Sequence, residues 1–165
     1  ATCALWVCDR PLGPRKWKVA SASALASASL ALLINRVVAE LWTRQRPFAT
    51  HPSAHVWGGR SHDPSFPSDH ASAAFAIAFT ILLFDQVVGS IFVVAAVVVA
   101  VGRVVVGAHY PSDVLAGLLV GLGSALFVVR AGRPTILRLV RVVERFTDPV
   151  LAPLWRRLPV LRWSR

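Results

Sequence analysis

The chain has 165 residues, of which 55% are hydrophobic and 16% are charged, against about 25% charged residues in soluble domains. This composition excludes an ordinary water-soluble domain, because so few polar residues could not cover its surface. The net charge of +10 does not indicate nucleic-acid binding, because the basic residues lie mainly in two blocks beside apolar stretches, as expected next to anionic lipid headgroups.

The chain begins with a short apolar segment, residues 1–8, which contains both cysteines, Cys3 and Cys8. These cysteines lack metal-ligand spacing, and we expect them to pack as small apolar side chains rather than to form a disulfide. The sequence contains no methionine. We therefore expect that N-terminal sequence is missing from the chain, so no targeting signal can be assigned.

Four apolar stretches are each close to the roughly 20 residues that a helix needs to cross the hydrocarbon core. They are residues 19–42, 66–84, 87–108 and 112–129. Arg36 and Glu40 in the first stretch are spaced i,i+4 and can pair. Gly117 and Gly121 in the fourth have small-xxx-small spacing, which favours helix packing within one chain over a dimer face. The pattern predicts an all-α, polytopic membrane helix bundle, with residues 1–130 embedded in the membrane.

Residues 131–165 are predicted to form a basic amphipathic tail. Arg138, Arg141 and Arg145 recur at helical spacing and share one face. A helix of this kind is expected to lie on the membrane surface. We expect the tail to serve as a basic anchor rather than as a site for a specific partner.

The distribution of basic residues predicts the orientation of the chain in the membrane. Thirteen Lys and Arg residues lie in the segment 9–18 and after Val129, whereas three lie in the long loop 43–65. The tail and the first loop are therefore predicted to be cytoplasmic and the long loop extracytoplasmic. His51, His55 and His62 in that loop are expected to face lipid headgroups or solvent.

Three polar clusters interrupt this apolar sequence: residues 44–48, residues 66–70, and Arg103 with His109 and Asp113. The predicted topology brings all three to one membrane face, where ionisable residues are costly and mark function. Each cluster alone has a structural explanation. An arginine after a span can reach the interface, Ser68 or Asp69 can cap a helix, and a lone histidine is often structural.

Together, the clusters suit phosphoryl transfer. Arginine side chains match phosphate oxygens, and backbone N–H groups at the helix start after Pro67 can bind an anion. His109 and Asp113 are four residues apart, so the carboxylate can reach one ring nitrogen and leave the other free to attack phosphorus. His70 can act from another span as general acid. A metal site is the alternative, but the arginines would repel a cation.

The sequence resembles the type 2 phosphatidic acid phosphatase superfamily, whose motifs read roughly KxxxxxxRP, PSGH and SRxxxxxHxxxD. Residues 46–47, residues 67–70 and the set Arg103, His109 and Asp113 match them in order. The stretch RPFATHPSAHVWGGRSHDPSFPSDHAS is similar to the bacterial undecaprenyl-diphosphatase branch. The resemblance covers residues 19–129. The chain departs from the motifs at Ala39, in place of lysine, and at Gly102, in place of serine.

The resemblance implies a six-span fold whose N-terminal spans are absent here, and it implies no metal or organic cofactor. It implies that His109, held by Asp113, forms a phosphohistidine and that His70 protonates the leaving oxygen. The residues expected to bind phosphate are Arg46, Arg103, Ser68 and Arg44, the last as a candidate replacement for the motif lysine.

The expected substrate is undecaprenyl diphosphate, converted to undecaprenyl phosphate at the outer face of a bacterial cytoplasmic membrane. Phosphatidic acid and phosphatidylglycerophosphate are alternative substrates. A catalytically degenerate membrane scaffold and a haem or ion carrier are alternatives of other classes. The expected partners are a polyprenyl or phospholipid phosphate and membrane lipids, and the oligomeric state is not predicted.

Overall fold

The computed structural model describes residue 6, residues 15–50 and residues 63–157. Cys3, Cys8, His51, His55 and His62 lie outside these residues, as does the end of the tail. The described elements are all helices, which confirms the predicted all-α class. They are α2 (Lys16–Leu41), α3 (Pro47–Thr50), α4 (Asp69–Phe84), α5 (Gln86–Val105), α6 (Pro111–Arg130) and α7 (Arg133–Arg157).

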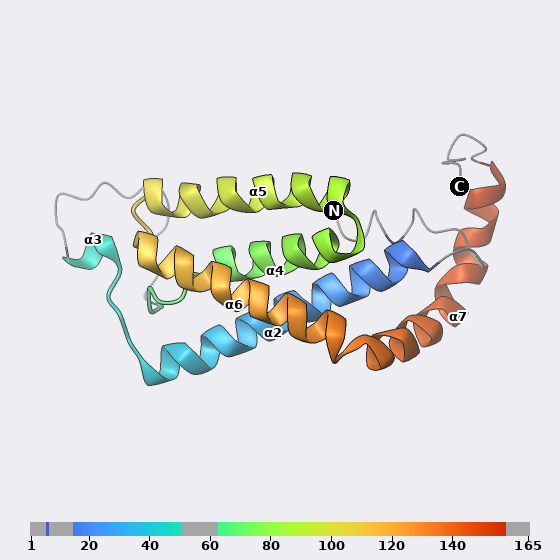
Figure 1. Ribbon diagram of the computed structural model, residues 1–165, viewed down its shortest axis with the longest axis horizontal. Coiled ribbons are helices and arrows are strands. Elements are labelled where there is room, and N and C mark those ends of the chain that lie inside the picture. The colour runs from blue at the N-terminus through green and yellow to red at the C-terminus, as the bar shows by residue number, and fades with distance from the viewer. Residues whose placement is uncertain (1–5, 7–14, 51–62, 158–165) are drawn as a thin grey trace.

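Four of the described helices form a bundle, α2, α4, α5 and α6, in which α4 contacts each of the other three. Figure 1 shows α3 and the turn between α5 and α6 at one end of this bundle and α7 at the other. Because α4 lies among three helices, the position of its first turn is determined by packing on several sides.

Three of the described helices, α2, α5 and α6, are long and apolar enough to cross a membrane. The second predicted span, residues 66–84, is helical only from Asp69. Its 16 residues extend about 24 Å at 1.5 Å per residue, less than the roughly 30 Å of a hydrocarbon core. The predicted start of this span was wrong by three residues, because residues 66–68 form a non-helical approach to α4.

Small residues allow the helices to approach closely. A Cβ atom on Gly121 would lie 2.8 Å from the Ser72 carbonyl oxygen and 2.8 Å from the Ala76 nitrogen of α4. A Cβ atom on Gly117 would lie 3.0 Å from the Ser68 carbonyl oxygen. The two glycines therefore bring α6 against α4, which confirms the predicted helix packing within one chain.

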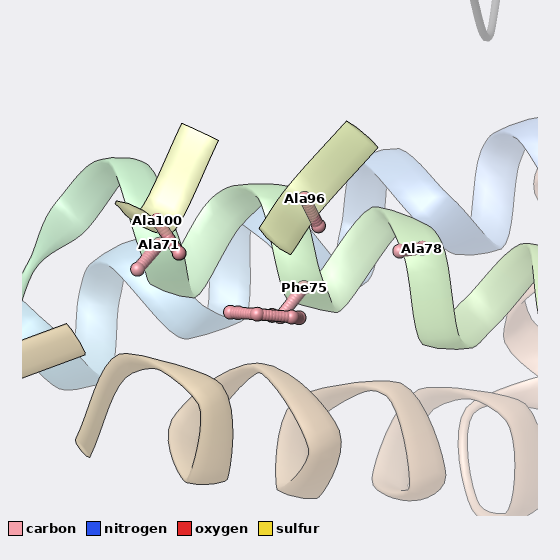
Figure 2. Packing of buried hydrophobic residues seen from close by; sticks show 5 residues of the cluster. All are labelled: Ala71, Phe75, Ala78, Ala96 and Ala100. Atoms are coloured by element: carbon pink, nitrogen blue, oxygen red, sulfur yellow. The ribbon is translucent and has the colours of Figure 1, made fainter. Parts of the chain in front are cut away.

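The core between α4 and α5 is built largely from alanine around one aromatic ring. Figure 2 shows Ala96 and Ala100 of α5 facing the α4 residues Ala71, Phe75 and Ala78. A buried hydroxyl pair adds a polar contact deeper in the bundle, where Thr80 Oγ1 of α4 donates to Ser27 Oγ of α2 at 2.9 Å. Such small side chains bring helix backbones close together, as in other membrane bundles.

The α7 end is joined to the bundle by apolar packing and by ion pairs. Ile136 and Val140 are buried against residues of α2 and α6. The side chain of Lys18 is 1% exposed and lies 3.3 Å from Glu144 and 2.7 Å from Asp148. Arg138, Arg141 and Arg145 are exposed, as expected for the basic face of an amphipathic helix. The location of α7 at the inner membrane surface stays a prediction.

Replacing Gly121 with valine is expected to push α4 and α6 apart, because the new side chain would overlap the α4 backbone. Overpacking of this kind costs about 1–3 kcal/mol, so the midpoint of thermal unfolding in detergent should fall. Gly123→Val is the matched control, since a Cβ atom there meets nothing within 4 Å. Equal unfolding midpoints for the two variants would contradict the packing described here.

Candidate active site

The three polar clusters meet at the end of the bundle where α3 lies (Figure 1). Arg46 follows α2, and its Nη1 atom is 3.4 Å from Nε2 of His109, which precedes α6. The Ser68 backbone N–H at the start of α4 donates to the Asp113 carbonyl in α6 at 3.1 Å. Segments far apart in the sequence are therefore in direct contact, as the predicted topology required.

The turn between α5 and α6 places His109. Gly107 has a φ angle of 71°, in the left-handed region that glycine adopts without a steric cost. After this residue the chain reverses, and the N–H groups of Ala108 and His109 both donate to the carbonyl oxygen of Arg103, at 3.1 and 3.2 Å. The third motif is thus one local structure, in which the last turn of α5 supports the histidine directly.

The His109 ring is 3% exposed, and its hydrogen bonds define which nitrogen is free. Nδ1 lies 2.8 Å from the carbonyl oxygen of Ser65. A carbonyl can only accept, so Nδ1 carries the proton and Nε2 carries the lone pair. Arg46 Nη1, at 3.4 Å, faces that lone pair.

Burial lowers the pKa of His109 from 6.5 to about 4. The bond to the Ser65 carbonyl opposes this shift, the charges of Arg46 and Arg103 add to it, and the charge of Asp113 opposes it. The ring is therefore neutral near pH 7. A neutral imidazole with an unprotonated Nε2 is the form that can attack an electrophile.

The contact of Asp113 with the His109 ring differs from the expectation. Its Oδ2 atom lies 3.8 Å from His109 Nδ1, which is close but too long for a hydrogen bond. The prediction that the carboxylate approaches the ring is confirmed, whereas the expected hydrogen bond is made by the Ser65 carbonyl. Asp113 Oδ2 instead accepts from Ser65 Oγ and from the Tyr110 backbone N–H. Its effect on the ring is therefore electrostatic and indirect.

Arg44 is engaged with Asp113. Its Nη1 atom donates to Asp113 Oδ1 at 2.8 Å and to Ser112 Oγ at 2.7 Å, and its guanidinium lies 4.1 Å from the centre of the Tyr110 ring. These contacts form what we call the Asp113 network: Arg44, Ser65, Tyr110 and Ser112 around Asp113. Direct phosphate binding by the same nitrogen of Arg44 would require it to leave these partners.

Two buried polar atoms at this end of the bundle have no hydrogen-bond partner among the residues that the structure describes: Ser68 Oγ and Arg103 Nε. Ser68 is fully buried at the N-cap position of α4. Its side chain makes no capping bond, so the structural alternative in which this hydroxyl caps α4 does not hold. Buried polar groups are rarely left unpaired. Both residues were predicted to bind phosphate, and unpaired donors suit that role.

Positive charge is concentrated around the same place. Burial and then the charge of Arg103 lower the pKa of Arg46, while Asp63, Asp69 and Asp113 oppose this shift. The backbone N–H groups of the first turn of α4 add further donors, because they have no partner within the helix. Like charges near each other favour the binding of an anion.

His70 lies exposed in the first turn of α4, and its charged neighbours are Arg103, Asp69 and Arg46. The two histidines therefore share both arginines. Asp69 is bonded in turn to Asn35 of α2, whose Nδ2 donates to Asp69 Oδ1 at 2.7 Å and to Ser72 Oγ at 2.9 Å. These contacts connect the turn that carries His70 to the neighbouring helix.

The structure adds residues that the sequence did not indicate. Ser65 acts partly through its backbone carbonyl, which no side-chain motif reveals, and Asn35 lies in an apolar span far from the motifs. An isolated amide in a membrane helix was the available signal for Asn35. In the described part of the chain, no three His, Cys, Asp or Glu side chains are grouped as metal ligands would be.

Comparison with known proteins gives a family match and several relatives. The family model described as "PAP2 superfamily" matches residues 20–135, a range that contains all three motifs. The chain is 40% identical over 99 residues to "Bacitracin transport permease protein BcrC" of Bacillus licheniformis, an overlap that covers 60% of this chain and 49% of the relative.

Two further relatives carry names of enzymes. The chain is 33% identical over 116 residues to "Undecaprenyl-diphosphatase BcrC" of Bacillus subtilis (strain 168), with 68% of this chain and 60% of the relative covered. It is 37% identical over 126 residues to "Decaprenylphosphoryl-5-phosphoribose phosphatase" of Mycobacterium tuberculosis (strain ATCC 25618 / H37Rv), with 74% and 66% covered. The chain thus spans about half to two thirds of the length of these relatives.

The lowered pKa predicts that His109 stays neutral well below the ordinary range of histidine. With ¹⁵N-labelled histidine in detergent micelles, the His109 signal should show the Nδ1–H tautomer down to about pH 5, with protonation centred at about 4. Loss of the signal in His109→Gln assigns it, and circular dichroism checks that the fold persists. Titration of this ring near 6.5 would contradict the buried geometry.

The same shift has a consequence for folding. Between about pH 6.5 and 4 the unfolded chain binds a proton at His109 that the folded chain does not. The contribution of this residue to stability is therefore fully present above pH 6.5 and is lost as the pH falls through this window. His109→Gln, which does not titrate, should show a weaker decline in unfolding midpoint over that range.

Proposed function

Because the chain belongs to the PAP2 superfamily, we propose that it removes a phosphate group from a membrane lipid through a phosphohistidine on His109. The observation that carries this proposal is the neutral Nε2 of His109, which lies beside Arg46 at the end of the bundle where Ser68 and Arg103 have unpaired buried polar atoms. A nucleophile beside groups that can bind an anion is the arrangement that phosphoryl transfer requires.

In the first step, the Nε2 lone pair attacks the terminal phosphorus and forms a P–N bond. The bond from phosphorus to the leaving oxygen breaks, its electron pair stays on that oxygen, and His70 donates a proton there. Arg46, Arg103, the Ser68 hydroxyl and the first N–H groups of α4 stabilise charge on the other phosphoryl oxygens. Arg46 must turn from Nε2 to the substrate for the attack to occur.

In the second step, water attacks the phosphohistidine. His70, now neutral, takes a proton from the water as the new P–O bond forms, and the P–N bond breaks with its electron pair returning to Nε2. The products are inorganic phosphate and the dephosphorylated lipid. His70 is suited to alternate between acid and base because it is exposed, whereas buried His109 stays neutral.

The surroundings of the site suit a lipid headgroup. The site lies at the end of helices that are apolar enough to cross a membrane. Trp42 and Phe66 form a ring pair there, with centroids 5.8 Å apart, and tryptophan is enriched at the membrane interface. The phosphate group of a lipid at the membrane interface can reach His109 while the hydrocarbon chain of that lipid remains in the bilayer.

We favour undecaprenyl diphosphate as substrate and the outer face of a bacterial cytoplasmic membrane as the location. The name of the Bacillus subtilis relative and the distribution of basic residues support this choice. A phosphate monoester on a polyprenyl-linked pentose is the second candidate, because the Mycobacterium tuberculosis relative matches more of this chain than the Bacillus subtilis relative does. Phosphatidic acid and phosphatidylglycerophosphate remain alternatives within the class, and a catalytically degenerate scaffold is the alternative outside it.

Phosphate release from undecaprenyl diphosphate, decaprenylphosphoryl-5-phosphoribose, phosphatidic acid and phosphatidylglycerophosphate in detergent should separate these candidates. We expect the highest kcat/KM with undecaprenyl diphosphate and inhibition by vanadate. Faster turnover of the pentose phosphate would favour the second candidate. The absence of release from all four lipids by a folded protein would support the scaffold.

The covalent intermediate can be trapped by mixing the chain with substrate that carries a radiolabelled terminal phosphate and then quenching the reaction rapidly without acid. We expect an acid-labile, alkali-stable label on the wild-type chain and none on His109→Ala, because only Nε2 of that ring can form the P–N bond. Lys16→Ala, at the opposite end of α2, is the control and should retain the label. An unlabelled wild-type chain that still releases phosphate would indicate direct attack by water.

The contribution of His70 should depend on the leaving group. A departing lipid monophosphate needs less protonation than a departing alkoxide, and a general acid contributes about 10²- to 10⁴-fold. His70→Ala should therefore lower kcat less with undecaprenyl diphosphate than with phosphatidic acid. Because the same variant is compared on two substrates, folding losses cancel. Equal losses on both would count against His70 as the acid.

A further inference from the structure

Ser65 is bonded to three parts of the site at once. Its backbone carbonyl accepts from His109 Nδ1 at 2.8 Å, its hydroxyl donates to Asp113 Oδ2, and its backbone N–H donates to the Arg44 carbonyl at 2.8 Å. Ser65 is fully buried, as is Asp113. A residue with all its polar groups bonded and no access to solvent has little freedom to move.

These bonds close a ring of three residues. Arg44 Nη1 donates to Asp113 Oδ1, Ser65 Oγ donates to Asp113 Oδ2, and Ser65 N–H donates back to Arg44. Each bond to the carboxylate is charge-assisted and therefore stronger than a neutral one. The ring joins the segment after α2, the segment before α4 and the first turn of α6, so it fixes the Ser65 carbonyl relative to the His109 turn.

We propose that Ser65 is a positioning residue, whose hydroxyl, anchored on Asp113, orients its own backbone carbonyl to hold His109 with the proton on Nδ1 and the lone pair on Nε2. This inference rests on the proposed function of the site and adds to it the means by which Asp113 acts on the nucleophile. Asp113 is 3.8 Å from Nδ1, so its direct contribution is a charge, and Ser65 supplies the directional bond.

Removal of the hydroxyl should release this geometry without removing any charge. In Ser65→Ala, Asp113 Oδ2 loses one donor and the segment before α4 loses its anchor. The ring of His109 is then free to turn toward the carboxylate, which changes the direction of Nε2. Misplacement of a reacting atom by about 1 Å can cost 10²-fold in rate, whereas the groups that bind phosphate are untouched.

The test compares Ser65→Ala with Thr80→Val in the full chain. Thr80→Val also removes a buried hydroxyl bond, to Ser27 of α2, but Thr80 lies near the C-terminal end of α4, whereas the site lies at the N-terminal end of that helix. We expect Ser65→Ala to lower kcat by about 10- to 100-fold with KM nearly unchanged, and the rate of label incorporation on His109 to fall equally. Thr80→Val should keep wild-type kcat. Wild-type kcat in Ser65→Ala would overturn the proposal, as would equal losses in both variants.

Histidine ¹⁵N spectra provide a readout that does not depend on the substrate. The wild-type chain should show His109 as the Nδ1–H tautomer, and Ser65→Ala should shift the ring toward a mixture of tautomers. A wild-type Nε2–H tautomer would overturn the role of Ser65 even if Ser65→Ala did not fold. If the wild-type chain releases no phosphate from any lipid, the proposed function fails, while these spectra still decide the role of Ser65.

Discussion

The carboxylate of Asp113 is completely buried. The arrangement of the site follows from the hydrogen-bond donors that this buried carboxylate requires. An unpaired charge in such surroundings costs several kcal/mol. The donors come from three separate segments: the Arg44 guanidinium after α2, the Ser65 hydroxyl before α4 and the Tyr110 N–H at the start of α6. The hydrogen bonds to this one carboxylate therefore hold three helix ends together. His109 lies in the turn next to these bonds.

Those helix ends can meet only because the helices approach closely along their length. Gly117 and Gly121 of α6 carry no side chain where the α4 backbone approaches them most closely, and alanines fill much of the contact between α4 and α5. Asn35 reaches from α2 to the first turn of α4. In a bilayer, where apolar burial between helices supplies little driving force, such close contacts and buried hydrogen bonds carry the packing. The positions of the polar residues at the α3 end therefore depend on the close packing of the apolar helix segments.

The two ends of the bundle differ in whether their charged side chains are paired. At the α7 end, Lys18 is buried against Glu144 and Asp148, and Arg15 pairs with Glu144 at 2.8 Å, so positive and negative groups compensate each other. At the α3 end, Arg46 and Arg103 face two histidines, and the buried Arg103 Nε and Ser68 Oγ have no partner within the described residues. Compensated charge joins α7 to the bundle, whereas uncompensated donors are what an anionic substrate requires.

The sequence alone determined the helical class, the close α4–α6 packing and three of the residues near His109, namely Arg46, Arg103 and Asp113, because hydrophobic length, glycine spacing and side-chain chemistry are local properties. It placed the start of α4 three residues too early. Only the tertiary structure decided that the Ser65 carbonyl rather than Asp113 accepts from Nδ1, and that Arg44 is bonded to Asp113. The partners in these two contacts are separated by 44 and by 69 positions in the chain, respectively. A contact made by a backbone carbonyl also cannot be predicted from the pattern of side chains.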